Sequence, residues 1–270
     1  MFLPDASPKP DWRLAALVAV AVVAAGVALR LPPIPQDPAY HAFADRRTLL
    51  GIPNALNVLS NLPFVGVGFV GLRLVVAATG GAAWERAAFL VLFAGVLLTG
   101  AGSGYYHLAP STPALFWDRL PMTLAFMSLC ALTLGERASP RAGPWLLPLC
   151  LAAGLGSVVS WRSSELGGMG DLRLYGLVQF MPMVLMPLAL LFYPRRWIPG
   201  ADLAAVVGWY ALSKVFEALD AAIFAWGGLV SGHTLKHLAA GTATYWLLRV
   251  ALSWRQARGS RTLARPPAGV

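Results

Sequence analysis

Residues 86–108 read RAAFLVLFAGVLLTGAGSGYYHL, a run with no Asp, Glu, Lys or Arg after its first residue. The hydrocarbon core of a bilayer requires a helix of about 20 consecutive, mostly apolar residues. All backbone polar groups of such a segment must be hydrogen-bonded inside it, because lipid offers them no partners. The stretch therefore predicts a helix that crosses a membrane.

Similar apolar runs fill most of the chain. Its 270 residues are 57% hydrophobic and 12% charged, whereas about 25% of residues are charged in soluble domains. Charges, prolines and glycines separate eight candidate helices, near 13–31, 54–78, 86–108, 117–135, 144–161, 174–193, 202–226 and 233–252. We expect an all-α fold, a polytopic transmembrane helix bundle with a seven-helix core plus one additional N-terminal helix.

Three segments are expected along the chain. Residues 1–35 hold the extra N-terminal transmembrane helix, residues 36–254 form the seven-helix bundle, and residues 255–270 form a basic, disordered cytoplasmic tail. The first apolar run could also be a cleaved signal peptide. Arg30 and a proline cluster follow it without an evident cleavage site, which favours a retained helix. The two cysteines, Cys130 and Cys150, lie in apolar runs and are expected to pack there.

The basic residues indicate the orientation in the membrane. A formal charge of +9 would suggest nucleic acid as the partner of a soluble protein, but 18 of the 21 basic residues here are arginines, gathered at span ends. With eight spans, twelve basic residues fall on the side of the termini and six on the other. Positively charged loops stay in the cytoplasm. We therefore expect cytoplasmic termini and no nucleic-acid partner, and the Ala/Arg-rich composition suggests a bacterial inner membrane.

Three of the four histidines fall at span ends on the non-cytoplasmic side. His233 and His237 are four residues apart at the start of the last helix, so their rings share one face. His107 closes the third span, and His41 lies in the first outer loop. Single histidines near a membrane surface are often mere interfacial anchors, but three imidazoles with a fourth position open are typical of catalytic zinc. The predicted metal ligands are His107, His233 and His237.

Two further polar residues belong to the same membrane face. Ser103 precedes His107 by one helical turn, within a stretch of small residues that lets helices approach closely. Asp118 follows His107 by eleven residues, a connection too short to recross the membrane. A carboxylate beside zinc could relay protons, and a hydroxyl could bind a developing oxyanion. For Ser103, helix packing is a strong alternative.

Charged residues also occur on the seventh span, at Lys214, Glu217 and Asp220. They are expected first as a structural ion-pair array facing the bundle, with a role in substrate binding as the alternative. Lys236, between the last two histidines, is expected to snorkel to the interface, and contact with a lipid carboxylate is its alternative.

Four motifs together resemble the alkaline ceramidases. They are NVLSNL at 57–62, GSGYYH at 102–107, DRLPM at 118–122 and HTLKH at 233–237. The resemblance extends from about Ala44 to Trp254. These enzymes belong to a superfamily of seven-helix membrane hydrolases that includes the adiponectin and progestin receptors.

The resemblance implies a zinc ion held by His107, His233 and His237, with Ser103 and Asp118 as its polar partners. It implies cleavage of a ceramide-like amide into a fatty acid and a sphingoid base. Alkaline ceramidases also bind calcium through acidic residues ahead of the first motif. Here the matching stretch offers Asp45 and Asn54 but little other acid, so these two are the candidate calcium ligands of a doubtful site.

The sequence thus favours a zinc-dependent membrane amidohydrolase whose lipid substrate enters from the bilayer. A lipid-binding receptor with a structural zinc is the first alternative. A metal-ion transporter is the second, although it should place polar residues through the full depth of the membrane.

Overall fold

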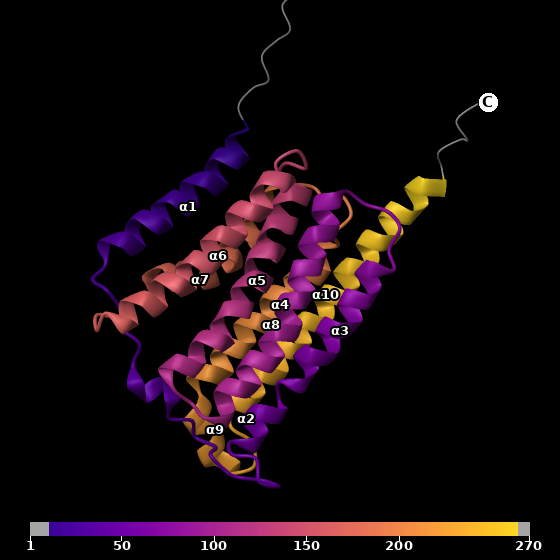
Figure 1. Cartoon of the computed structure of the whole chain (residues 1–270). Coiled ribbons are helices and arrows are strands. Elements are labelled where there is room, and N and C mark those ends of the chain that lie inside the picture. The colour runs from indigo at the N-terminus through magenta and orange to yellow at the C-terminus, as the bar shows by residue number, and fades with distance from the viewer. Residues whose placement is uncertain (1–10, 264–270) are drawn as a thin grey trace, which may run out of the picture.

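The computed structural model describes residues 11–263, which contain helices and no strands (Figure 1). The long helices are α1 (Trp12–Arg30), α3 (Leu62–Val76), α4 (Ala83–Leu108), α5 (Thr112–Arg137), α6 (Gly143–Leu166), α7 (Arg173–Phe192), α8 (Gly200–Ala218) and α10 (Gly232–Leu263). Three short helices accompany them: the 3₁₀ helix η1 (Pro38–His41), α2 (Ala55–Leu59) and α9 (Asp220–Gly227).

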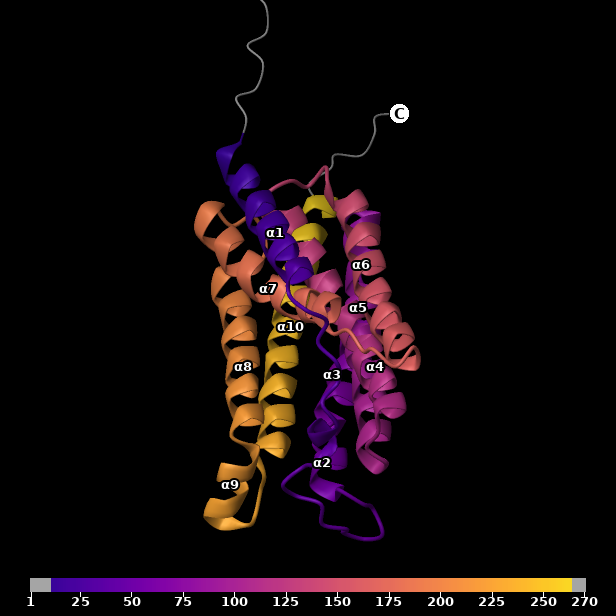
Figure 2. The same ribbon diagram turned by 90° about the vertical axis from the view of Figure 1, so that its left-hand side faces the viewer.

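The long helices form one bundle, with α1 lying outside it against α7 (Figures 1 and 2). Six segments of the described chain are long and apolar enough to span a membrane: α1, α2–α3 taken together, α4, α5, α6 and α7. The helices α8 and α10 complete the bundle although they carry more charge, and they pack against each other along their length. This is the expected polytopic bundle of seven core helices plus one N-terminal helix, and the protein is a multi-pass membrane protein.

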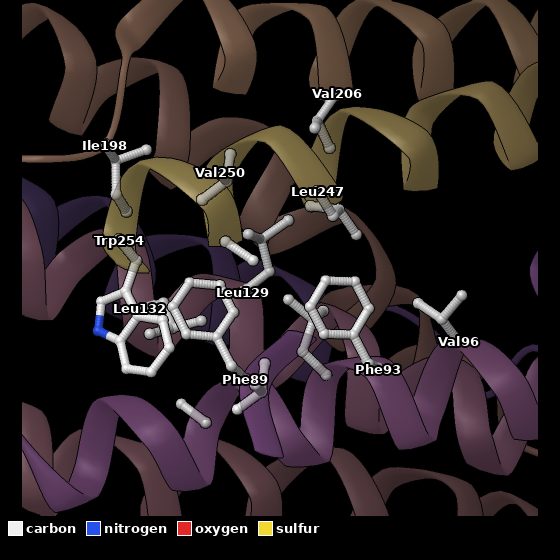
Figure 3. Packing of buried hydrophobic residues seen from close by; sticks show 14 of the residues in the cluster. Phe89, Phe93, Val96, Leu129, Leu132, Ile198, Val206, Leu247, Val250 and Trp254 are labelled. Atoms are coloured by element: carbon white, nitrogen blue, oxygen red, sulfur yellow. The ribbon is translucent and has the colours of Figure 1, made fainter. Parts of the chain in front are cut away.

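The start of α1 and the end of α10 lie at one end of the bundle, and α2 and α9 lie at the other (Figure 1). The first end contains the apolar core of α4, α5, α8 and α10. Figure 3 shows these side chains, among them Phe89, Phe93, Val96, Leu129, Leu132, Val206, Leu247, Val250 and Trp254.

Close packing holds this core together, because lipid tails are themselves apolar and burial from lipid brings little hydrophobic gain. Glycines permit the closest approaches. A Cβ on Gly71 of α3 would lie 2.1 Å from the ring of Phe93 on α4. The larger residue on one helix thus fills the space that the missing side chain leaves on its neighbour.

Several helix bounds differ from those expected. The second span was expected as one helix over 54–78, but it is divided between α2 and α3, and α5 begins at Thr112, ahead of the expected 117. The seventh span was expected to run over 202–226, but α8 ends at Ala218 and the chain turns at Leu219 before α9 begins. The last helix was expected to end near 252, with a disordered tail from 255, but α10 continues to Leu263. Arg258 in this extension pairs with Glu85 of α4, which ties it to the bundle. Residues 264–270 of the predicted tail, and Lys9, lie outside the described residues.

Candidate metal centre

Three histidines meet at the α2–α9 end of the bundle. His107 comes from the last turn of α4, and His233 and His237 come from the first turns of α10. All three side chains are buried, and one ligand atom of each lies within 4.8 Å of the others. The Nε2 atoms of His107 and His233 are 3.3 Å apart. The predicted ligands are therefore brought together in space.

Backbone packing and caps fix the position of α10. A Cβ on Gly232 would lie 2.3 Å from the carbonyl oxygen of Phe216 on α8, so only glycine allows this approach. The carboxylate of Asp220 accepts hydrogen bonds from the amides of His233, at 2.7 Å, and Ala44, at 3.0 Å. An acidic group at a helix N-terminus satisfies an amide that has no partner within the helix. Asp220 therefore fixes the start of α10 and does not extend the lysine and glutamate array of α8.

The short helix α2 orients the His237 ring. The hydroxyl of Ser60 lies 2.8 Å from His237 Nδ1, and the amide of Asn61 lies 3.4 Å from the same nitrogen. A hydrogen bond on one ring nitrogen fixes the orientation and tautomer of an imidazole whose other nitrogen binds a metal. The segment carrying these residues resembles a ceramidase motif, but only the fold shows that it contacts the predicted ligand His237.

An aromatic side chain covers the outer side of the cluster. Phe43 is buried, and its ring centroid lies 4.7 Å from that of His107 and 4.4 Å from that of His233. Excluding water strengthens electrostatic interactions among the groups beneath it.

Ser103 and Asp118 face each other across α4 and α5 near the histidines. Both are buried, and the Ser103 hydroxyl is a side-chain hydrogen-bond partner of the Asp118 carboxyl group. Gly102 makes this possible, because a Cβ there would lie 2.0 Å from the carbonyl oxygen of Trp117. The small-residue stretch thus serves both helix packing and the site.

A cavity of about 590 Å³ reaches this site from the middle of the bundle. Such a volume is within the usual range for small-molecule pockets. Its apolar walls come from α1, α4, α5, α7, α8 and α10, and His237, Ser103 and Asp118 are among its polar lining residues. An acyl chain in the cavity would therefore place its polar end beside the histidines.

The lysines also belong to the cavity wall. Glu217 pairs with both Lys214, on its own helix, and Lys236, on α10. Lys236 is therefore directed into the bundle, and the expectation that it snorkels to the interface is wrong. Tyr40 of η1 donates to Glu217 Oε1 at 3.1 Å. Burial raises the pKa of Tyr40 to about 12, so this phenol keeps its proton at neutral pH.

The candidate calcium ligands each have other hydrogen-bond partners. Both carboxylate oxygens of Asp45 accept hydrogen bonds from Arg47, which hold the pKa of Asp45 below its usual value. The amide nitrogen of Asn54 donates to the backbone oxygen of His107 at 2.9 Å. Calcium prefers a cage of six to eight oxygen ligands. The arginine-paired carboxylate of Asp45 and the single side-chain oxygen of Asn54 do not make such a cage.

His41 is not part of the metal cluster. Its ring nitrogens lie 2.8 Å from the Tyr106 hydroxyl and 3.0 Å from the Thr112 hydroxyl. Burial lowers its pKa, and nearby Arg119 lowers it further. His41 therefore joins the outer loop to α4 and α5 as a neutral ring.

The histidine cluster fits a zinc ion by the chemistry of its donors. Three buried imidazoles, one with a hydrogen-bond partner at its second nitrogen, could hold a metal ion, and a three-imidazole set is of the kind found in catalytic zinc sites. Nothing else in the described residues forms a group of three or more His, Cys, Asp or Glu side chains placed to share an ion.

Comparison with known sequences relates part of the chain to one family. No curated protein matches the chain. A family model described as Ceramidase matches residues 51–181, which include Ser103, His107 and Asp118, whereas His233 and His237 lie beyond the match. Residues 51–181 are therefore similar to the ceramidase family, as the three motifs inside this stretch predicted.

Proposed function

We propose that this protein is a zinc-dependent amidohydrolase of the membrane, which cleaves the N-acyl amide of ceramide or a ceramide-like lipid into a fatty acid and an amine, the sphingoid base. One observation carries the proposal: three buried histidines converge beside Ser103 and Asp118 at the polar end of an apolar cavity. A bound zinc ion would polarise the amide carbonyl and acidify water.

The side chains around the histidines suit the two proton transfers of amide hydrolysis. Asp118 takes a proton from the attacking water and returns it to the leaving amine. In the structure, the Ser103 hydroxyl is a hydrogen-bond partner of Asp118. During the reaction it donates to the substrate's carbonyl oxygen as negative charge develops there.

The cavity wall supports access from the bilayer. Val20, Ala24 and Ala28 of α1 line the cavity together with residues of α7 and α8. Its apolar surface continues the environment of a lipid tail, so the acyl chain moves from membrane to pocket without exposure to water. In the proposed orientation, both termini are cytoplasmic, in a bacterial inner membrane, and the metal centre faces the other side.

Incubation of the purified, zinc-loaded protein with ceramide and a bacterial lipid extract tests this proposal. Mass spectrometry should show release of fatty acid, loss of that release after chelation, and recovery when zinc is added back. If every acyl amide stays intact while lipid still binds, the lipid-receptor alternative is correct. Ion flux into proteoliposomes without hydrolysis would favour the transporter.

A further inference from the structure

The polar end of the cavity holds more basic than acidic side chains. Arg173 lines the cavity too, but both carboxylate oxygens of Asp171 bind it, so its charge is already paired. The other charged lining residues are three cations and two anions. The cations are Arg119, Lys214 and Lys236, and the anions are Asp118 and Glu217.

The two lysines share a single carboxylate. Lys236 Nζ lies 2.5 Å from Glu217 Oε1, the oxygen that Tyr40 also contacts, and Lys214 binds Glu217 Oε2. An ammonium group has three donors, whereas the described residues give each lysine one carboxylate oxygen. The remaining donors are available to the cavity, which both side chains line.

The remaining charges do not balance this pair. Arg119 donates to the neutral Gln36 side chain at 2.7 Å and stacks near Trp161, with its guanidinium carbon 4.4 Å from the ring centroid. Lys236, Arg119 and Lys214 all act electrostatically on Asp118, which the proposed reaction requires as a proton acceptor. By formal charge, these lining residues therefore carry one more positive than negative charge before any metal ion is counted.

A surplus cation inside a membrane protein is costly unless an anion neutralises it. A purely structural array would pair its charges within the protein. Here the unshared ammonium donors border a cavity beside the reacting groups, and Lys236 directly precedes a predicted metal ligand in the chain.

We propose that Lys214 and Lys236 bind an acidic group, a carboxylate or a phosphate, on the amine half of the lipid amide. This inference rests on the proposed function and names its substrate class: N-acyl lipids with an anionic headgroup a few bonds from the amide nitrogen. The apolar walls receive the acyl chain, so the charged end of the lipid lies at the lysines.

Matched lipid pairs test this inference on the purified, zinc-loaded protein. For the carboxylate, N-palmitoylglycine is compared with its methyl ester. For the phosphate, N-palmitoyl phosphoethanolamine is compared with N-palmitoylethanolamine. Binding and palmitate release are measured for each lipid. At least one acidic lipid should exceed its neutral partner by about tenfold in kcat/KM, the equivalent of about 1.4 kcal/mol.

Charge variants identify the groups responsible. Lys214→Met and Lys236→Met should each remove the preference for the acidic lipid while the neutral lipid is still cleaved. Glu217→Gln should strengthen that preference, because it removes the carboxylate that competes for both ammonium groups. Arg73→Met, an exposed cation of α3 far from the cavity, is the matched control and should change nothing.

Equal kcat/KM values for the acidic and neutral lipids of both pairs would overturn the inference and leave the proposed hydrolase intact. Lysine-dependent binding of acidic lipids without palmitate release would support the inference and contradict the proposed hydrolase. If a lysine variant fails to fold, the wild-type comparison and Glu217→Gln still test the inference. An unchanged preference for the acidic lipid in Glu217→Gln would contradict binding of that lipid by the lysines.

Discussion

A hydroxyl from a distant part of the chain lies closer to His237 Nδ1 than the Asn61 amide does. Ser60 on α2 lies 2.8 Å from His237 Nδ1 and is buried with it. Removing a hydrogen-bond partner of a metal-bound histidine typically lowers metal affinity by about 10–100-fold. Ser60→Ala should therefore weaken zinc binding to that extent, as measured by competition with a chelator.

Ser157→Ala is the matched control for this substitution. Ser157 is equally buried, but its hydroxyl donates to the backbone oxygen of Gly154 within α6. Its zinc affinity should equal that of the wild type. Equal affinities in both serine variants would contradict the role assigned to Ser60.

Residue types and spacing were enough to predict which histidines come together but not which residues contact them. The four-residue spacing of His233 and His237 puts both on one face of any helix, and the short loop after His107 keeps Asp118 at the same end. Tyr40 and Arg119 line the cavity because of how the helices pack. The sequence around each residue does not predict that position. Lys236 was assigned to the interface because its ion-pair partner, Glu217, lies on another helix. The sequence around Lys236 does not show that pairing.

At the scale of elements, the approach of α4 to α5 sets the site. A Cβ at Gly102 would lie 2.0 Å from the Trp117 carbonyl oxygen, a backbone atom that cannot rotate away. Gly102→Ala should move α5, and Asp118 with it, away from Ser103. We expect a loss of about 1–3 kcal/mol in stability, typical of overpacking, and a large loss of activity.

Gly104 offers a control on the same helix, since a Cβ there would meet nothing within 4 Å. Gly104→Ala should keep full activity and change stability by no more than about 1 kcal/mol, because alanine favours the helix over glycine. Thermal unfolding in detergent together with fatty acid release measures both effects. Similar behaviour of the two variants would show that the α4–α5 contact does not control the site.

The helix α1 is expected to shape the acyl pocket from outside the seven-helix core. Ala24 lines the cavity, whereas the neighbouring Val23 is exposed on the helix surface. Ala24→Trp should fill part of the cavity and shift hydrolysis toward shorter acyl chains. Val23→Trp should leave the chain-length profile unchanged, and the same shift in both variants would exclude α1 as a pocket wall.

The helix boundaries show which features the sequence pattern predicts and which it does not. Most long helices begin close to the expected residue, because charges and prolines interrupt the apolar runs, whereas α3 begins at Leu62 and α5 at Thr112. The turn at Leu219 falls between Glu217 and Asp220, two charges that were assigned to one continuous span, and the structure places it where Asp220 caps α10. The end of α8 coincides with a contact between Asp220 and the start of α10. Composition alone could not predict that boundary.

At the scale of the whole molecule, the proposed orientation places the metal centre on the non-cytoplasmic side. Leu50, fully exposed, lies in the loop at the metal-centre end, and Arg141, also exposed, lies in the loop between α5 and α6 at the opposite end. In intact cells, a membrane-impermeant maleimide should label Leu50→Cys and spare Arg141→Cys until the membrane is permeabilised. The native Cys130 and Cys150 lie within helices of the bundle, and the unsubstituted protein gives the background. Labelling of Arg141→Cys alone would invert the topology.

The central claim is that His107, His233 and His237 bind one zinc ion that the reaction needs. The most direct test measures zinc content and fatty acid release together in purified His107→Ala, His237→Ala and Asp118→Asn proteins. Each histidine variant should lose zinc and turnover together, whereas Asp118→Asn should keep zinc and lose rate by about 10²–10⁴-fold, the usual contribution of a positioned acid–base group. Hydrolysis that persists at the wild-type rate in a variant lacking both His107 and His237 would contradict the account.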